Sequence, residues 1–271
     1  PLSAQQGAVL NRQDRLGRPL YAFVRVRIVG ALDASRLCTL LDELQRRHEI
    51  LRTRYLRMDG LRRPVQVVEQ AVVSPLRAAR AGEAGEVVRS ALAQVAFAAA
   101  VVEEAGDARS FVVLLGASLA SVDAWALQHL AQVLRQGYDS GLPAADDEAL
   151  QYIDYASWQG ELIAEAIGVQ GAAYWRGVQE AASPRAPLPF EREASATGVD
   201  HVEVPAGELL HALDRRAGAL GMPADDLLLF LWGGFLCRLA DQPQVALTVV
   251  LDGRNDQVQH ILGRFERRLP L

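Results

Sequence analysis

Apolar and charged residues alternate near the start of the chain and predict a strand. Between Phe23 and Val29, the apolar side chains are separated by Arg25 and Arg27, as in a strand with one buried face. Gly30 ends this pattern, and Asp33 then offers a side-chain oxygen that can cap the first turn of a helix. The apolar residues expected on one face of that helix are Leu37, Leu40, Leu41 and Leu44.

Two apolar runs further along, Phe97 to Val102 and Phe111 to Leu115, predict a pair of neighbouring strands. Gly106 and Asp107 lie between these runs and favour a turn, so a hairpin is the simplest interpretation. Similar patterns predict a strand over residues 65–68, a helix over 86–94 and a helix over 121–134.

The last third of the chain begins with a segment that lacks any periodic pattern. Residues 181–200 contain three prolines, which favours a linker between two domains. We expect a helix over 206–220 and a buried strand over 245–251. A second helix, starting at Pro223, is almost wholly apolar, and a helix that is apolar on all sides is expected inside a core. The elements together predict an α/β fold with domains over 1–180 and 201–271.

Composition and charge argue against several classes of protein and of site. Half of the 271 residues are hydrophobic and the net charge is −5, so the chain lacks the basic surface of a nucleic-acid binder. The longest apolar run, Leu227 to Leu236, is about half the length that a membrane span requires. Cys38 and Cys237 lie far apart and have no Cys or His neighbour, so we expect neither a metal site nor a disulfide. No basic and apolar leader precedes the first element, and we expect a cytoplasmic protein.

Several short segments occur in an order that resembles the signatures of one family. RHEILRT, from Arg47 to Thr53, is nearly identical to the pattern R-H-E-x-L-R-T, and YIDYASWQ, from Tyr152 to Gln159, matches Y-x-D-[FY]-A-x-W-Q. These are signatures of the condensation domains of nonribosomal peptide synthetases. The other matching segments are PLSAQQ (1–6), YW (174–175), LPFER (188–192), LDGR (251–254) and LGRFERRLPL (262–271).

This resemblance implies a fold of two lobes, each similar to chloramphenicol acetyltransferase, with a tunnel between them. Carrier proteins deliver two thioesters on phosphopantetheine arms from opposite ends of the tunnel, and the thioesters meet at a histidine. No cofactor is expected in the domain itself. Family members extend well beyond the last signature, so we expect residues 1–180 to be a first lobe, 181–200 a linker, and 201–271 part of a second lobe.

The resemblance places the centre of the site directly after the second strand of the hairpin. The family carries H-H-x-x-x-D-G there, and this chain reads SLASVDA. Ser118 and Leu119 stand in place of the two histidines, Asp123 is kept, and Ala124 replaces the glycine. Leu119 can neither accept nor donate a proton, and losing a positioned base costs about 10²–10⁴ in rate. We therefore expect the site to be inactive in the family reaction.

The resemblance also assigns residues around the centre. Asp123 is expected to be structural and to pair with Arg254, while His48 and Arg52 of RHEILRT are expected to satisfy local backbone groups. Arg267 and Arg268 replace residues of the family's F-V-N-T and are expected to be solvated or paired at the tunnel wall. The set expected to line the tunnel or to pack between the lobes is Tyr152, Asp154 and Trp158.

Three functions remain open. The first is a non-catalytic platform that recruits carrier proteins or a tailoring enzyme, or that spaces neighbouring domains. The second is an active acyl-transfer domain that uses other residues; related cyclisation domains carry D-x-x-x-x-D, of which Ser118 and Asp123 would supply only half. The third is a serine hydrolase, because GASLA imitates the G-x-S-x-G elbow around Ser118, and Asp252 and His260 follow in order.

Overall fold

The computed structural model describes residues 1–104, 109–144, 149–181, 188–190 and 205–271. The chain forms two compact units. Unit 1 comprises Pro1–Gly171 and Val250–Arg267, and unit 2 comprises Ala172–Val249 and Arg268–Leu271. Each unit is described by itself below.

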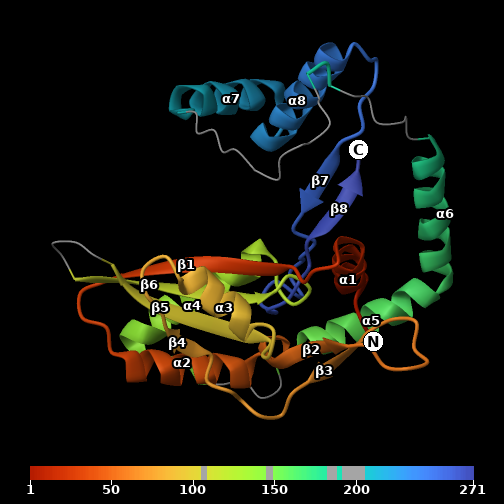
Figure 1. Cartoon of the computed structure of the whole chain (residues 1–271). Helices are drawn as coiled ribbons and strands as arrows, with labels where there is room; N and C mark the ends of the chain where they lie inside the picture. Colours follow the sequence, from red (N-terminus) through yellow and green to blue (C-terminus); the bar gives the residue numbers. More distant parts are fainter. Residues whose placement is uncertain (105–108, 145–148, 182–187, 191–204) are drawn as a thin grey trace. The chain divides into compact units, whose positions relative to one another are not determined.

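A four-stranded sheet forms the centre of unit 1 and has the strand order β1-β6-β5-β4 (Figure 1). β1 (Tyr21–Val29) pairs antiparallel with β6 (Ser110–Ser118), which pairs antiparallel with β5 (Phe97–Glu104). The short strand β4 (Leu76–Ala78) lies parallel to β5. The predicted strands and their antiparallel pairing are confirmed, whereas the predicted turn at Gly106 and Asp107 lies outside the described residues.

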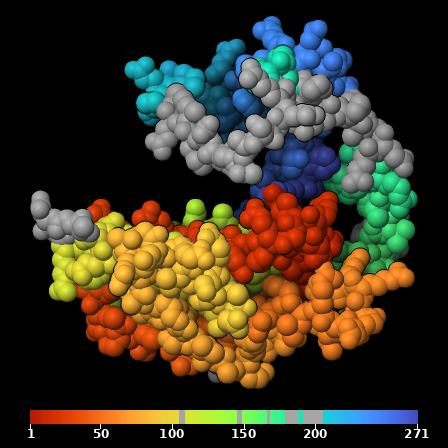
Figure 2. Space-filling model, viewed as in Figure 1, coloured from red at the N-terminus to blue at the C-terminus, as the bar shows by residue number. Residues whose placement is uncertain are grey.

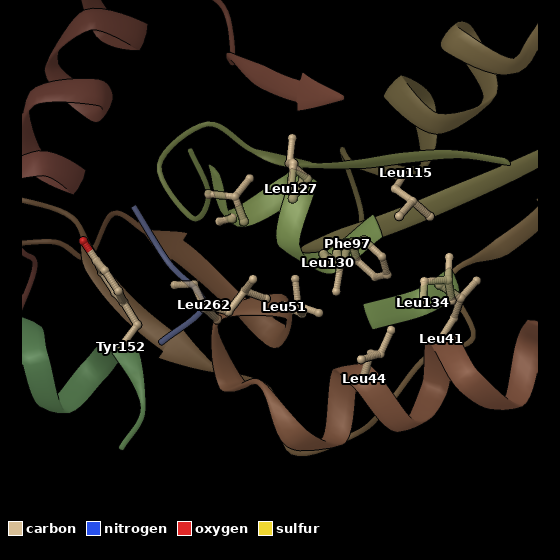
Figure 3. Close-up of a cluster of buried hydrophobic side chains, with 14 of the residues drawn as sticks. Leu41, Leu44, Leu51, Phe97, Leu115, Leu127, Leu130, Leu134, Tyr152 and Leu262 are labelled. Carbon is tan, nitrogen blue, oxygen red and sulfur yellow. The ribbon is translucent and has the colours of Figure 1, made fainter. Parts of the chain in front are cut away.

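Helices cover both faces of this sheet. α2 (Ala34–Arg47) and α4 (Ala124–Ser140) contribute to the main core on one face (Figure 3), and α3 (Ala84–Ala91) packs on the other. Successive side chains of β5 point to opposite faces of the sheet: Phe97 belongs to the main core and Ala98 to the core under α3. The predicted face of α2 is confirmed, since its four leucines, Leu37, Leu40, Leu41 and Leu44, are buried.

Smaller elements surround the sheet in unit 1. α1 (Ala4–Leu16) begins with a capping box, in which Ser3 and Gln6 each accept a hydrogen bond from the other's main-chain N–H. Asp33 caps α2 by accepting from the N–H groups of Ser35 and Arg36, as predicted. The remaining elements of this unit are η1 (Glu49–Arg52), β2 (Thr53–Leu56), β3 (Val65–Val68) and α5 (Tyr152–Ala164).

The apolar helix predicted from Pro223 forms, but its expected burial is wrong. α8 (Ala224–Ala240) buries Leu227, while Phe230 is 73% exposed and Trp232 is 52% exposed. An apolar pattern identifies a surface that is expected to pack against another element, but it does not identify that element. No described element of unit 2 packs over this face of α8. The other elements in this part of the chain are α6 (Ala166–Ala181), α7 (Gly207–Leu220), β7 (Thr248–Leu251) and β8 (Arg267–Pro270).

The strand predicted over 245–251 is shorter than expected and is not buried. β7 spans Thr248–Leu251, most of its residues are exposed, and it pairs only with β8 in a two-stranded sheet. Among the described residues, no single helix is long and apolar enough to cross a bilayer; α7 and α8 reach that length and composition together, with a bend of 102° between them. The predicted domain ranges stay a prediction, because most of the proposed linker lies outside the described residues.

Candidate functional site

The site's centre is the tight turn that joins β6 to α4. The Ser118 hydroxyl oxygen accepts the main-chain N–H of Ala120 at 3.2 Å, so this hydroxyl stabilises the turn itself. The Leu119 N–H donates to the Leu20 carbonyl oxygen at 2.9 Å. The Leu119 side chain packs with Val9 and Leu10 of α1 in a small apolar cluster. In this arrangement neither Ser118 nor Leu119 has a partner with which to transfer a proton.

Asp123 is buried and binds three separate parts of unit 1. One carboxylate oxygen accepts the Ala126 N–H at 2.8 Å and thereby caps α4. The carboxylate also accepts two hydrogen bonds from Arg254, at 2.9 and 3.0 Å. The N–H groups of Phe265 and Glu266 donate to it at 2.8 and 3.1 Å. The expected contact between Asp123 and Arg254 is therefore present, and the many donors leave the carboxylate no free lone pair for a base. Ala124 begins α4.

The Arg254 side chain is only 3% exposed and is enclosed by aromatic rings. Its guanidinium carbon lies 4.1 Å from the ring centre of Trp125 and 4.6 Å from that of Phe265. It also donates to the Gly263 carbonyl oxygen at 2.9 Å and pairs with Asp252. The guanidinium therefore links several segments of unit 1, while its buried Nε forms no hydrogen bond with any residue that the structure describes.

Arg264 is a buried residue next to the β6–α4 turn whose contacts the sequence analysis did not anticipate. Its guanidinium is buried and donates to the main-chain oxygens of Leu119 at 3.1 Å and Val122 at 3.4 Å. It also pairs with Glu266 at 3.1 Å, where the side chains are 5% and 17% exposed. A signal was available: two opposite charges two positions apart flank the apolar Phe265, the spacing at which side chains share one face of an extended segment.

Signatures that are far apart in the sequence meet around Tyr152. The Ser3 and Tyr152 hydroxyls share a hydrogen bond at 2.9 Å, and Tyr152 donates to the Arg264 carbonyl oxygen. Burial raises the pKa of Tyr152, so the hydroxyl stays protonated. Gly263 approaches the Tyr152 ring so closely that a Cβ on Gly263 would lie 1.9 Å from a ring carbon. The signatures PLSAQQ, YIDYASWQ and LGRFERRLPL therefore meet at Tyr152 in unit 1.

The other residues expected at a tunnel or lobe interface have local surroundings within their own elements. Asp154 accepts the Gln151 N–H at 2.9 Å and completes the capping box of α5. Trp158 is 48% exposed on the same helix. Arg267 and Arg268 are exposed in β8, as expected for solvated or paired charges. A role of these residues in a tunnel or between lobes stays a prediction.

The segment after α2 contains His48 and Arg52, and the Arg52 side chain stabilises it. His48 ends the helix, and burial, with smaller effects of His129 and Arg47, lowers the pKa of His48 to about 4. Arg52 donates to the carbonyl oxygens of Gln45, at 2.9 Å, and Glu69. His48 also lines a cavity of about 680 Å³ together with the exposed His260.

The residues of the hydrolase hypothesis are not brought together. Ser118 does not line the cavity that contains His260, and Asp252 pairs with Arg254. Burial lowers the pKa of His129, whose ring stacks on Trp125 at 4.8 Å. Within the described residues, no three His, Cys, Asp or Glu side chains are placed to hold a metal ion. Cys38 and Cys237 are free thiols.

Known proteins are similar to this chain in sequence and in fold. Tyrocidine synthase 3 of Brevibacillus parabrevis is 27% identical over 89% of this chain, which corresponds to 4% of that protein. Surfactin synthase subunit 2 of Bacillus subtilis is 27% identical over the whole chain, or 8% of that protein. The chain thus spans a small fraction of the curated relatives that it matches.

Solved structures extend the likeness to the fold. The X-domain from teicoplanin biosynthesis superposes with a TM-score of 0.76 at 21% identity, and the match covers this chain fully and 64% of that chain. The first condensation domain of the calcium-dependent antibiotic synthetase gives 0.75 at 20% identity, and the match covers 68% of that chain. The family model described as Condensation domain matches residues 120–271, more than half of the sequence. This chain therefore belongs to the condensation-domain family, with the α/β fold of chloramphenicol acetyltransferase-like lobes.

Proposed function

We propose that this chain is a degenerate condensation domain of a nonribosomal peptide synthetase, which does not form peptide bonds and serves as a structural or recruitment platform. Its partners are carrier proteins, with their phosphopantetheine arms, neighbouring synthetase domains, or a tailoring enzyme. The domain itself uses no cofactor in this role. We place it in the cytoplasm, which the two free thiols support.

The observation that carries this proposal is the environment of Leu119. In the family pattern a histidine at this position assists the attacking amine, and an aliphatic side chain has no lone pair with which to do so. Leu119 packs against Val9 and Leu10, and its main-chain oxygen accepts a hydrogen bond from Arg264. The leucine is therefore integrated into its surroundings, which supports a lasting loss of the histidine.

The recruitment role has support from a relative in fold. One solved structure with this fold is a complex of the X-domain with OxyB, from teicoplanin biosynthesis, with a TM-score of 0.72. That complex supports the idea that a domain of this fold can bind a second protein. At 21% identity the likeness concerns the fold alone.

The two catalytic alternatives, an acyl-transfer domain and a serine hydrolase, have less support. An acyl-transfer domain of the cyclisation type would need a second acidic residue where Ser118 stands, and Asp123 is already saturated by its donors. A hydrolase would need Ser118 beside a base, but its hydroxyl accepts the Ala120 N–H. Both alternatives predict a reactive centre at the β6–α4 turn, which makes them testable with the same protein.

The deciding experiment is a reconstituted condensation assay. The purified chain, in its parent module, is mixed with loaded donor and acceptor carrier proteins, and dipeptidyl thioester is measured by mass spectrometry. We expect no product above a reaction without the domain, while an active condensation domain in parallel gives product. Product above background would refute the proposal. A serine-reactive phosphonate should leave Ser118 unlabelled, and an adduct at Ser118 would favour the hydrolase.

A further inference from the structure

One cavity of unit 1 takes no part in the site described above. It has a volume of about 680 Å³, and neither Ser118 nor Leu119 lines it. Its walls come from the end of α2, from η1, from α4 and from the segments that precede α5 and Gly263. In the colours of Figure 2 these segments run from orange to blue, so the cavity joins parts that lie far apart in the sequence.

Part of the cavity wall is apolar. Leu44 and Ile261 line it and are buried, and Val133 and Leu142 line it beside them. Sites for small molecules usually have volumes of about 300–1,000 Å³ and mostly apolar walls with a few polar groups. The cavity fits this description, and its apolar wall can pack against an apolar side chain of a ligand.

Arginine side chains in the same wall have hydrogen-bond donors to spare. Glu43 accepts from Arg46 at 3.2 Å and from the Nε of Arg47 at 2.9 Å, so its carboxylate is already paired. The two terminal nitrogens of Arg47 bind no residue that the structure describes. Arg52 uses its Nε and one terminal nitrogen for carbonyl oxygens, which leaves its other terminal nitrogen unused. A guanidinium with unused donors is suited to a carboxylate, which it can bind through two parallel hydrogen bonds.

Glu49 brings an unpaired negative charge to the cavity, two positions after Arg47. Its main-chain N–H donates to the Gln151 side chain at 3.1 Å, and its carbonyl oxygen accepts from Thr53 at 2.8 Å. Its half-buried carboxylate bonds to no residue in the described part of the chain. Such a carboxylate has lost hydration without gaining a partner, and a positively charged group in the cavity would compensate it.

His48 adds hydrogen-bonding capacity to the cavity without adding charge. Burial, with smaller effects of His129 and Arg47, lowers the pKa of His48 to about 4, so the ring is neutral at pH 7. A neutral imidazole has one N–H donor and one acceptor, and the His48 ring uses neither with any described residue. The cavity therefore presents donors for a carboxylate, an acceptor for a cation, and an apolar surface.

We propose that this cavity binds a free α-amino acid with an apolar side chain. The carboxylate of the amino acid pairs with the unused donors of Arg47 and Arg52, its ammonium group pairs with Glu49, and its side chain packs on the apolar wall. A simple anion would leave Glu49 unpaired, and a simple cation would leave the guanidinium donors unused. No residue of the β6–α4 turn takes part, so this binding goes beyond the proposed function and does not depend on it.

The first test separates the two charges of the ligand. Binding to the unchanged chain is measured by isothermal titration calorimetry with L-leucine as the probe. Two analogues each lack one charge: 4-methylpentanoate has no ammonium group, and 3-methylbutylamine has no carboxylate. We expect L-leucine to bind at least about ten-fold more tightly than either analogue, since each analogue loses a charge-assisted pair.

The second test changes the residues of the cavity. Glu49→Gln removes the charge and keeps the main-chain bonds, so it should bind L-leucine about ten-fold more weakly, and 4-methylpentanoate at least as tightly as the unchanged protein does. The matched control is Glu86→Gln, on the exposed side of α3 and outside the cavity, which should bind L-leucine within about two-fold of the unchanged protein. Leu150→Trp, at an exposed position of the wall, narrows the cavity and should abolish binding. Circular dichroism checks the fold of each variant.

Several outcomes would overturn the amino-acid site. L-leucine might show no binding to the unchanged protein, or it might bind no better than either analogue. Equal effects of Glu49→Gln and Glu86→Gln, or full binding by a folded Leu150→Trp variant, would also exclude this cavity. None of these results bears on the condensation assay, so the proposed function fails or survives separately.

Discussion

The guanidinium of Arg264 donates a hydrogen bond to the main-chain oxygen of Leu119, 145 positions earlier in the sequence, at 3.1 Å. The last signature thus holds the turn that carries the altered site. The positive charge of Arg264 is balanced by Glu266, which stands where the family pattern has an uncharged residue. The leucine and the buried ion pair therefore form one local arrangement, which explains how a buried arginine is tolerated near the centre of the site.

Replacing Arg264 should destabilise unit 1 strongly. Arg264→Met removes the donor to Leu119 and Val122 and takes the cation away from Glu266. Breaking a buried ion pair by removing one partner costs about 3–5 kcal/mol. We expect a loss of this order in the free energy of unfolding, measured with urea. The double variant Arg264→Met/Glu266→Val should recover part of that loss, since neither charge remains; a double variant no more stable than the single one would contradict the coupling.

Gly263 should not tolerate a side chain. Gly263→Ala would place a Cβ 1.9 Å from a carbon of the Tyr152 ring, which is buried and held by hydrogen bonds to Ser3 and Arg264. Overpacking of this kind costs about 1–3 kcal/mol, and we expect at least that loss in thermal or urea unfolding. Gly160→Ala is the matched control, because Gly160 lies in α5 with nothing within 4 Å of its Cβ position. The control should be neutral or stabilising by up to about 1 kcal/mol, and equal losses in both variants would refute the close approach.

Titration of His48, at the end of α2, should make the stability of the protein fall as the pH becomes acidic. Burial lowers the pKa of His48 to about 4, below the ordinary value of 6.5. Between these values the unfolded chain binds a proton on His48 that the folded chain does not, so stability falls as the pH falls. The slope is at most about 1.4 kcal/mol per pH unit for one group.

The comparison is between the unchanged protein and His48→Gln, by urea unfolding at several pH values between the folded pKa of about 4 and the ordinary pKa of 6.5. The glutamine variant should lose less stability on acidification, because it lacks the titrating group. Parallel pH profiles of the two proteins would show that His48 is not protonated on unfolding in this range. His129, whose pKa burial also lowers, contributes to both profiles.

Local patterns were sufficient for most of unit 1. The alternation in β1 and the leucine spacing in α2 identified both elements and their buried faces, since each depends on neighbours in the sequence. The partner of Asp123 also followed from the family signatures, and the structure places Arg254 there. The first two inferences use periodicity, which is a local property, whereas the contact between Asp123 and Arg254 joins residues 131 positions apart and was expected only from the family resemblance.

Without a family signature, long-range contacts could not be predicted, and neither could the elements that pack over an apolar surface. Nothing near Arg264 in the sequence indicates that its guanidinium reaches the carbonyl oxygens of Leu119 and Val122, because that contact depends on how the two segments cross. For α8 the apolar pattern was recognised, but burial depends on a covering element, which periodicity does not locate. The sequence therefore predicts which surfaces need partners better than it predicts the partners.

Restoring the two histidines should not restore activity. In the variant Ser118→His/Leu119→His, the second imidazole would enter an apolar cluster with Val9 and Leu10, beside a carbonyl that the Arg264 cation holds. Burial and a nearby positive charge both lower the pKa of an imidazole, and loss of the Ser118 hydroxyl removes the acceptor for the Ala120 N–H. We expect lower stability and no dipeptidyl thioester in the reconstituted assay, measured by mass spectrometry. A variant with Ser118→Ala and Leu119→Ala controls for the loss of stability alone. Formation of product by the histidine variant, but not by the alanine variant, would show that the rest of the site is still competent and that only the histidines were lost.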